Sequence, residues 1–540
     1  MNRRSLSLLL VAVSSCAVAA VGACSSGNSG SPGKGSSGDG GSGPDATNTT
    51  EAGAGDSGAP YSVQVPCTDT PDSIYQDPGT LPATAGAIIR CAHYEDFTAA
   101  QLLAEAQTPD LLNDGGISVP GYTGPAFPSG AHVYRVLYRT ERGDTNNTPG
   151  YSSALVFIPD TPKAAQSPVI VASHGSRGQA PQCAPSTDND AGAYVEGDFK
   201  RQVYPLVGAG YAVIAPDLAG YANFGATNNP PSAYADVLDV GKSTLDGARA
   251  LKLILGSSLQ ENVILVGHSQ GGGTALGALT LASTYAPELT IAGVAVYSPL
   301  WLSARLNGAF LLLPSKYPLA TTPEGPVIIW YLYTHSELLD GPGHGLDLFN
   351  TDKQAAITQF VNNDCWEATY PTLNDAGVVI TDLVSQSFAS AIGSVAAGFP
   401  ASATCASNSS DPTLCNTWMS RFEADWPHIA GAAAKIPILS LYGAQDQTIT
   451  PDLAACVFDR YASDQANVTV CLDPTAGHSS LVAFQADYVN QWIAALVNGG
   501  AQPAPCKYNQ NNLVEDDAGV VSPGDDAGKP VQCNTLVPPT

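Results

Sequence analysis

Short apolar runs alternate with longer segments of helical apolar spacing over about residues 66–498. Strands and crossover helices that alternate in this way build a mostly parallel sheet. Runs that are apolar at every position are typical of parallel strands buried on both faces. The pattern therefore predicts an α/β fold, with central strands at residues 169–172, 212–215, 263–266, 292–296, 438–441 and 468–472.

Two further strands precede the parallel part. Residues 132–139 and 152–158 flank a turn region rich in Asn, Thr and Pro, and we expect them to pair in antiparallel fashion at the edge of the sheet. Farther along, apolar or small residues between Val237 and Leu255 follow helical spacing. A crossover helix is expected there, ahead of the next central strand.

The alternation breaks between residues 298 and 435. Apolar runs at 311–313 and 327–332 and an Ala-rich stretch at 385–397 show no strand–helix rhythm. Leu and Ala runs are usual packing residues, so this segment could simply be more core. Its place between two central strands favours an inserted, largely helical cap.

Both ends of the chain have compositions that do not build a core. Two arginines in residues 1–4, an apolar run at 6–21 and small residues before Cys24 predict an export signal, too short to span a membrane. Residues 25–60 are mostly Gly, Ser, Asn, Asp and Thr, which predicts a flexible tether. An acidic low-complexity tail is expected at 499–540, which leaves 61–498 for the folded domain.

The residues before Cys24 resemble the lipobox of bacterial lipoproteins, whose cysteine is acylated and becomes the new N-terminus. A weaker match ends at Cys16, and an ordinary cleaved signal is the other alternative. The tether favours an anchored protein. We therefore expect export and a lipid anchor at the outer membrane or cell surface, with secretion as the alternative.

The net charge and the number of cysteines narrow the binding partners and cofactors to be expected. A net charge of −26 argues against nucleic acid, whose phosphates need a basic face. Of the 12 cysteines, Cys16 and Cys24 fall in the signal, and the even number that remains predicts disulfides in an oxidising compartment. No CxxC pair or His/Cys cluster has zinc spacing, so we expect no metal. We also expect a monomer.

Residues 262–273 read NVILVGHSQGGG, an aliphatic strand followed at once by GxSxG and a small-residue helix. This is the context of a nucleophile elbow, where glycines at Gly267 and Gly271 avoid collisions in a tight strand-to-helix turn. Ser269 is the candidate nucleophile, with His268 beside it in the elbow.

A serine hydroxyl needs a base, and the base needs a carboxylate that sets its tautomer. In this fold the acid and then the histidine follow the serine along the chain. Asp446 follows the strand and glycine turn of IPILSLYGAQD, and His478 follows the strand of VTVCLDPTAGH. Asp452, read as a helix N-terminal residue, and Asp473, read as a turn residue, are the competing acids.

An oxyanion hole is expected from the N–H after the nucleophile and from the loop after an early strand. Gln270 supplies the first. The segment VIVASHGSRG places Ser176 as the second donor, with an uncertainty of one position.

Several motifs together resemble the secretory lipase family of α/β-hydrolases, lipase A type, over about residues 77–498. They are PGT at 78–80, VLYRT at 136–140, CAPS at 183–186, GYAVIAPD at 210–217 and the GHSQGG elbow. The resemblance implies a hydrolase of triacylglycerols or fatty-acyl esters with no cofactor, a helical cap at 298–435 and a disulfide between Cys183 and Cys365.

Other disulfides are local guesses: Cys67 with Cys91, Cys405 with Cys415, and Cys456 with Cys471. The anchor, tether, acidic tail and extra cysteines are not part of the family's core.

The expected activity is ester hydrolysis outside the cytoplasm, and the apolar cap favours long acyl chains. A short-chain esterase and an acyl or prolyl peptidase use the same triad, because the fold alone does not choose the substrate. No N-terminal propeller-like repeat is visible, which counts against the peptidase. A non-enzymatic surface binding protein should have lost a triad member, and all three candidates are present.

Overall fold

The computed structural model describes residues 61–540 except 115–116, 188–198, 223–228, 317, 320–323, 399, 401, 505, 507–512, 516–520, 524–528 and 531–540. The predicted signal and tether, including Cys24, and most of the acidic tail, including Cys533, lie outside the described residues.

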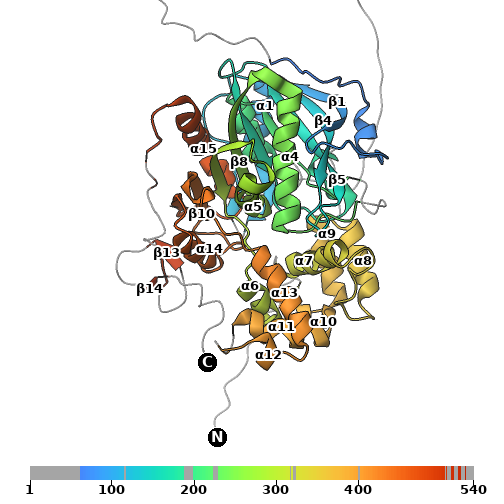
Figure 1. Cartoon of the computed structure of the whole chain (residues 1–540). Coiled ribbons are helices and arrows are strands. Elements are labelled where there is room, and N and C mark those ends of the chain that lie inside the picture. The colour runs from blue at the N-terminus through green and yellow to red at the C-terminus, as the bar shows by residue number, and fades with distance from the viewer. Residues whose placement is uncertain are drawn as a thin grey trace, which may run out of the picture. The chain divides into compact units, whose positions relative to one another are not determined.

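A nine-stranded sheet forms the centre of the described chain (Figure 1). In spatial order its strands are β1 (Ile88–Phe97), β4 (Ala131–Glu141), β5 (Pro149–Pro159), β7 (Val213–Pro216), β6 (Ser167–Ser173), β8 (Leu259–His268), β9 (Thr290–Tyr297), β10 (Ile438–Gly443) and β11 (Val468–Asp473). Two small sheets pair β2 (Asp110–Asp114) with β3 (Ile117–Val119), and β12 (Leu513–Glu515) with β13 (Val521–Pro523) and β14 (Lys529–Pro530).

The sheet is parallel from β7 to β11 and antiparallel from β1 to β7. All six predicted central strands are confirmed within one or a few residues, and the pairing of β4 with β5 is antiparallel as predicted. Their place at the edge is wrong, because β1 pairs with β4 outside them. The polar residues of β1, which reads IIRCAHYEDF, hide its strand pattern.

Successive residues of the central strands pack on opposite faces of the sheet, as the strand geometry requires. In β8, Val263 and Leu265 join one apolar cluster, whereas Ile264 and Val266 join another. The first face is covered by α4 (Val237–Leu255), α5 (Gln270–Tyr285) and α14 (Pro451–Ser463), and the second by α1 (Ala99–Gln107), α3 (Tyr204–Gly208) and α15 (Ser480–Asn498). Burial on both faces explains the continuous apolar runs.

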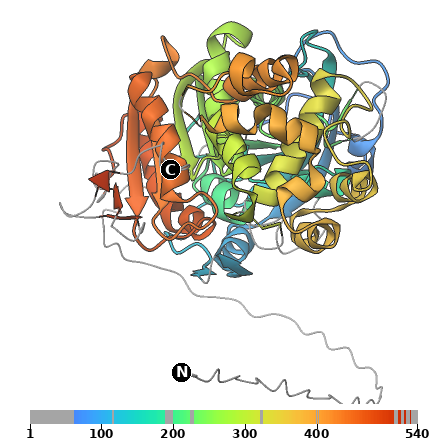
Figure 2. The same ribbon diagram turned by 90° about the horizontal axis from the view of Figure 1, so that it is seen from below.

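Residues 298–435, here called the insert, connect β9 to β10 and are largely helical. Their helices gather at one end of the sheet (Figures 1 and 2). They enclose an apolar cluster of their own, which includes Trp330, Phe360 and Trp418. The helices are α6 (Ala304–Leu312), α7 (Glu324–Leu339), α8 (Gln354–Asn363), α9 (Trp366–Ala376), α10 (Ile380–Leu383), α11 (Gln386–Ala397), α12 (Cys405–Asn408) and α13 (Pro412–Ala424).

In the described part of the chain, no helix is both long and apolar enough to cross a bilayer.

Four disulfides are present among the described residues. Cys67–Cys91, Cys183–Cys365 and Cys405–Cys415 confirm three predicted pairs. The second of them ties the loop after β6 to the start of α9 in the insert.

The predicted pair of Cys456 with Cys471 is wrong, since Cys471 bonds to Cys506. The alternation of β11 explains the error. Val470 and Leu472 pack with Ala454 of α14, so Cys471 faces the opposite side, where it joins the cluster of α15 and Cys506.

Candidate active site

Ser269 stands between the end of β8 and the first residue of α5, in a turn of unusual backbone conformation. Its φ of 55° lies in the left-handed region, which is uncommon for a residue with a side chain. Its N–H donates to the carbonyl of Tyr297 at 2.9 Å, and its own carbonyl accepts the N–H of Leu300 at 2.8 Å. The end of β9 and the start of the insert thus hold the strained turn in place.

Two glycines make this turn possible. A Cβ atom on Gly267 would lie 2.0 Å from the carbonyl oxygen of Gly271, and one on Gly271 would lie 2.1 Å from that of Ser173. Both contacts are far shorter than real Cβ contacts, so only glycine fits either position. The glycines predicted from the GxSxG pattern are therefore required by backbone packing around Ser269.

His478 and Asp446 form a hydrogen-bonded pair. The Nδ1 atom of His478 lies 2.8 Å from Oδ2 of Asp446, and both residues are buried. The other oxygen, Oδ1, accepts the N–H groups of Thr448 and Ile449, each at 2.8 Å. The carboxylate is thus held at both oxygens, and it faces the imidazole at a fixed angle.

The loops that carry this pair are joined by backbone contacts across β10 and β11. Gln445 donates its N–H to the carbonyl of Ala476 at 2.9 Å, and Ala444 donates to that of Asp473 at 2.8 Å. A Cβ on Gly443 would lie 2.3 Å from the oxygen of Ala476. A glycine at the end of β10 therefore lets the acid loop approach the histidine loop.

The elbow also contacts the histidine loop. The ring centroids of His268 and His478 are 4.7 Å apart, and Nε2 of His268 lies 3.2 Å from the carbonyl oxygen of His478. His268 immediately precedes Ser269, so this contact places the elbow serine and the His478–Asp446 pair in one neighbourhood.

The pKa of Asp446 is below its ordinary value. Burial of the carboxyl would raise the pKa, but the attraction and hydrogen bond of His478 outweigh that effect, with help from backbone N–H donation. Asp446 is therefore ionised at neutral pH.

The two competing acids have other positions. Asp473 accepts the N–H and hydroxyl of Thr475 and the amide of Gln485, which is the turn role expected from sequence. Asp452 is the second residue of α14, after Thr450 and Pro451, as its sequence position suggested.

The loop after β6 lies against the elbow, because the missing side chain of Gly271 leaves room for the carbonyls of Ser173 and His174. Gln270 opens α5, where N–H groups lack acceptors within the helix. The hydroxyl of Ser176 lies 2.6 Å from that of Tyr234. Tyr234, which precedes α4, was missed by sequence reasoning because no local pattern links it to this loop.

The loop after β6 is also held by Asp217, a residue of the GYAVIAPD motif for which the sequence alone indicated no role. Asp217, at the end of β7, accepts the N–H of Ser186 at 2.7 Å and also its hydroxyl. Burial raises the pKa of Asp217, and its hydrogen bonds from Ser153 and Ser186 oppose the rise. The GYAVIAPD and CAPS motifs thus meet at one buried carboxyl.

Ser269 and His478 are both largely covered by neighbouring atoms of the chain. Ser269 is 6% exposed and His478 8% exposed.

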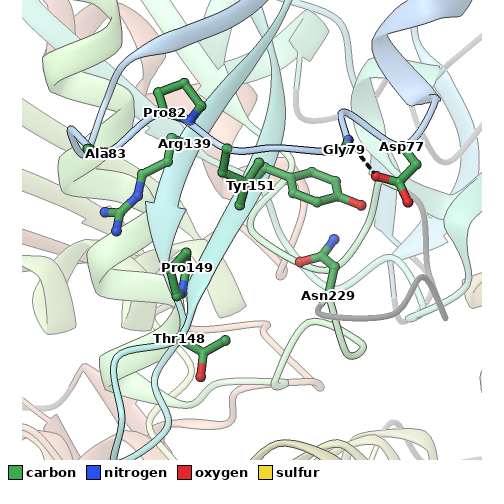
Figure 3. Close-up of a pocket in the computed structure, with 10 residues that line it drawn as sticks. Asp77, Gly79, Pro82, Ala83, Arg139, Thr148, Pro149, Tyr151 and Asn229 are labelled. Carbon is green, nitrogen blue, oxygen red and sulfur yellow. Dashed lines mark hydrogen bonds between the residues drawn. The ribbon is translucent and has the colours of Figure 1, made fainter.

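A pocket of about 580 Å³ lies elsewhere, between the segment before β1 and the hairpin of β4 and β5 (Figure 3). Tyr151 and Asn229 point toward each other across it, whereas Arg139 turns its guanidinium away. None of the three triad candidates lines it.

The sheet order, the strand–serine–helix turn and the histidine–carboxylate pair after β10 and β11 are those of the α/β-hydrolase class. Residues 169–492 match the model of the alpha/beta hydrolase family, and the chain belongs to this family.

Curated relatives are secreted fungal lipases. A secreted triacylglycerol lipase of Malassezia globosa is 32% identical over 169 residues, which is 30% of this chain and 27% of that protein. One of Malassezia furfur is 30% identical over 180 residues, 31% of this chain and 35% of that protein. The chain thus matches about a third or less of the length of these relatives.

Solved structures extend the likeness of the fold. Candida antarctica lipase A in its closed state superposes with a TM-score of 0.56 at 18% identity, covering 82% of this chain and 89% of that one. The rice cell wall degrading esterase LipA of Xanthomonas oryzae gives 0.53 at 17% identity, covering 78% and 100%.

Proposed function

We propose that the chain is an extracytoplasmic carboxylic ester hydrolase of lipase type, which acts on acylglycerols or other fatty-acyl esters. The observation that carries the proposal is the buried His478–Asp446 pair beside the strained elbow serine, Ser269. The similarity of about 30% of the chain to secreted triacylglycerol lipases favours lipid esters.

In the proposed reaction, His478 takes the proton of Ser269 as the serine oxygen attacks the acyl carbonyl. Asp446 holds the imidazole in the required tautomer and stabilises its cation. The backbone N–H groups of Gln270 and Ser176 would stabilise the oxyanion, and each such donor contributes about 100- to 1000-fold in turnover. His478 then protonates the leaving alcohol, and water releases the acid from the acyl-enzyme by the same steps.

The insert favours the proposal of a long-chain acyl substrate. It packs its own apolar cluster at the end of the sheet where the elbow lies, and the backbone N–H of Leu300 donates to the carbonyl of Ser269. Ester-binding sites are concave and mainly apolar, and an apolar segment beside the elbow can supply such a lining.

The test is hydrolysis of p-nitrophenyl esters from acetyl to palmitoyl by the exported chain and its Ser269→Ala variant. We expect turnover that depends on Ser269 and favours long acyl groups. A short-chain preference would indicate an esterase, and no ester turnover would contradict the proposal. Ser257→Ala, which replaces an exposed serine in the turn after α4, is the matched control and should retain full activity.

We also propose that Cys24 carries a lipid anchor and that residues 25–60 tether the enzyme to the cell envelope. The sequence around Cys24 and the Gly/Ser-rich composition after it support this. In a Cys24→Ala variant the protein should leave the membrane fraction while esterase activity persists. Unchanged membrane association would contradict the anchor.

A further inference from the structure

Three side chains of metal-binding types meet in the interior, and none of them belongs to the proposed triad. Asp236 is the N-cap residue of α4, His335 lies in α7, and Asp425 follows α13. All three are buried, and one ligand atom from each lies within 4.8 Å of the others. The cluster therefore joins the start of a core helix to two helices of the insert.

The histidine is oriented as a metal ligand requires. Nδ1 of His335 lies 2.8 Å from the carbonyl oxygen of Tyr331 one turn earlier in α7, and that oxygen can only accept. The N–H of the neutral ring is thereby placed on Nδ1. Nε2, the nitrogen that this tautomer leaves for a metal ion, faces the carboxylates, at 2.8 Å from Asp425 Oδ2 and 3.6 Å from Asp236 Oδ2. Metal-bound histidines commonly donate their second nitrogen to a backbone carbonyl in this way.

Each carboxylate is held by its other oxygen. Oδ1 of Asp236 accepts the N–H of Asp239 at 2.8 Å, and Oδ1 of Asp425 accepts the N–H of Val237 at 3.0 Å. The hydroxyl of Tyr331 donates to Asp425 Oδ2 at 2.5 Å. Both Oδ2 atoms are thus directed toward Nε2 of His335, and three acceptor atoms converge on one point.

The cluster brings two carboxylates and one imidazole together, and no Lys or Arg side chain of the described residues is hydrogen-bonded to either carboxylate. Arg142, a buried cation nearby, is paired through two of its nitrogens with Asp239, at 2.7 and 2.9 Å. That pair is neutral by itself. One divalent cation would neutralise both carboxylates of the cluster, whereas a proton on His335 would neutralise one.

We propose that Asp236, His335 and Asp425 bind one Zn²⁺ ion, which fastens the insert to the N-terminus of α4. One imidazole nitrogen and two carboxylate oxygens are a donor set that suits zinc. Ligand atoms around a tetrahedral ion with bonds of about 2.0–2.1 Å stand about 3.3 Å apart. The two distances from Nε2, 2.8 and 3.6 Å, lie on either side of that value.

A second group of possible metal ligands serves as a control and is not a competing metal site. His93, Asp96 and His132 come together on β1 and β4, but all three are exposed. The histidines already contact Asp96 at 2.9 and 2.6 Å, and His132 also contacts Asp160 at 3.2 Å. Water and these contacts satisfy the surface group without an ion.

The experiment measures zinc in the full chain after dialysis, by elemental analysis, in the wild type and in Asp96→Asn, Asp425→Asn and His335→Gln variants. We expect about one ion per chain in the wild type and in Asp96→Asn. We expect at least a tenfold loss of affinity in Asp425→Asn and His335→Gln. Equal zinc contents in all four proteins, or loss only in Asp96→Asn, would overturn the proposal.

A second measurement does not depend on whether the buried variants fold. The Asp96→Asn protein is stripped with a chelator and titrated with Zn²⁺ or Co²⁺. Zinc should raise the midpoint of thermal unfolding by several degrees, because an ion that binds only the native state stabilises it. Cobalt should give the visible absorption of a four-coordinate nitrogen and oxygen site. No stabilisation and no such absorption would show that His335 binds a proton between the carboxylates instead, which overturns the metal site.

Discussion

The Nδ1 atom of His478 lies 2.8 Å from Oδ2 of Asp446, although 32 residues separate them. An Nδ1–H that donates to the carboxylate leaves the lone pair of the ring on Nε2, the tautomer that a general base needs. Since His268 of the elbow contacts His478 directly, the pair and Ser269 lie in one neighbourhood.

Replacing Asp446 by Asn should lower kcat for ester hydrolysis by about 10⁴-fold with little change in KM, because the amide favours the wrong tautomer of His478. The fold should persist, since an Asn oxygen can still accept from Thr448 and Ile449. Asp473→Asn is the matched control at the end of the neighbouring strand. Comparable losses in both variants would point to disrupted loops rather than to a role of Asp446 in catalysis.

The low pKa of Asp446 predicts how stability depends on pH. A carboxyl with a folded pKa below its unfolded value of about 3.8 binds fewer protons in the folded state, so its contribution is present above that pH and is lost as the pH falls. The free energy of unfolding should therefore drop more steeply as the pH falls from about 5 to about 2 in the wild type than in Asp446→Asn. Urea titrations at several pH values measure this, and identical slopes would refute the assignment.

The disulfide between Cys183 and Cys365 should be the main covalent constraint on the insert. It closes a loop of 182 residues, whereas Cys405–Cys415 closes one of 10. Loop entropy predicts stabilisation of about 5 kcal/mol for the first and about 2.7 kcal/mol for the second. Unfolding of the two Cys→Ser double variants should show this order, and the reverse order would mean that the long loop is already ordered in the unfolded chain.

The Gly267→Ala substitution should prevent the elbow turn from forming, because the new Cβ would lie 2.0 Å from the carbonyl oxygen of Gly271. We expect a thermal unfolding midpoint lowered by several degrees and loss of Ser269 labelling by a fluorophosphonate. Gly277→Ala in α5, the helix after the elbow, is the control, since the atoms nearest to its Cβ would be those of Val237, at 3.3 Å or more. Normal labelling of Gly267→Ala would show that the turn can relax.

Local features were predictable because neighbouring residues specify them. An aliphatic strand, a tight turn that admits only glycine and a small-residue helix are contiguous, so Ser269 could be placed from residues 262–273 alone. The six central strands were found for the same reason, since burial on both faces leaves a continuous apolar run.

Contacts between distant elements depend on strand order and on which face of the sheet a side chain occupies. Neither can be read from neighbouring residues in the sequence. The polar pattern of β1 hid the true edge of the sheet, and the alternation of β11 turned Cys471 toward Cys506 rather than Cys456. Asp236 and Asp425 meet His335 from positions about 90 residues or more away along the chain, so no spacing rule could join them. Such contacts exist only when packing of the helices and the sheet brings the segments together, which is why the triad candidates could be inferred from sequence and the buried cluster could not.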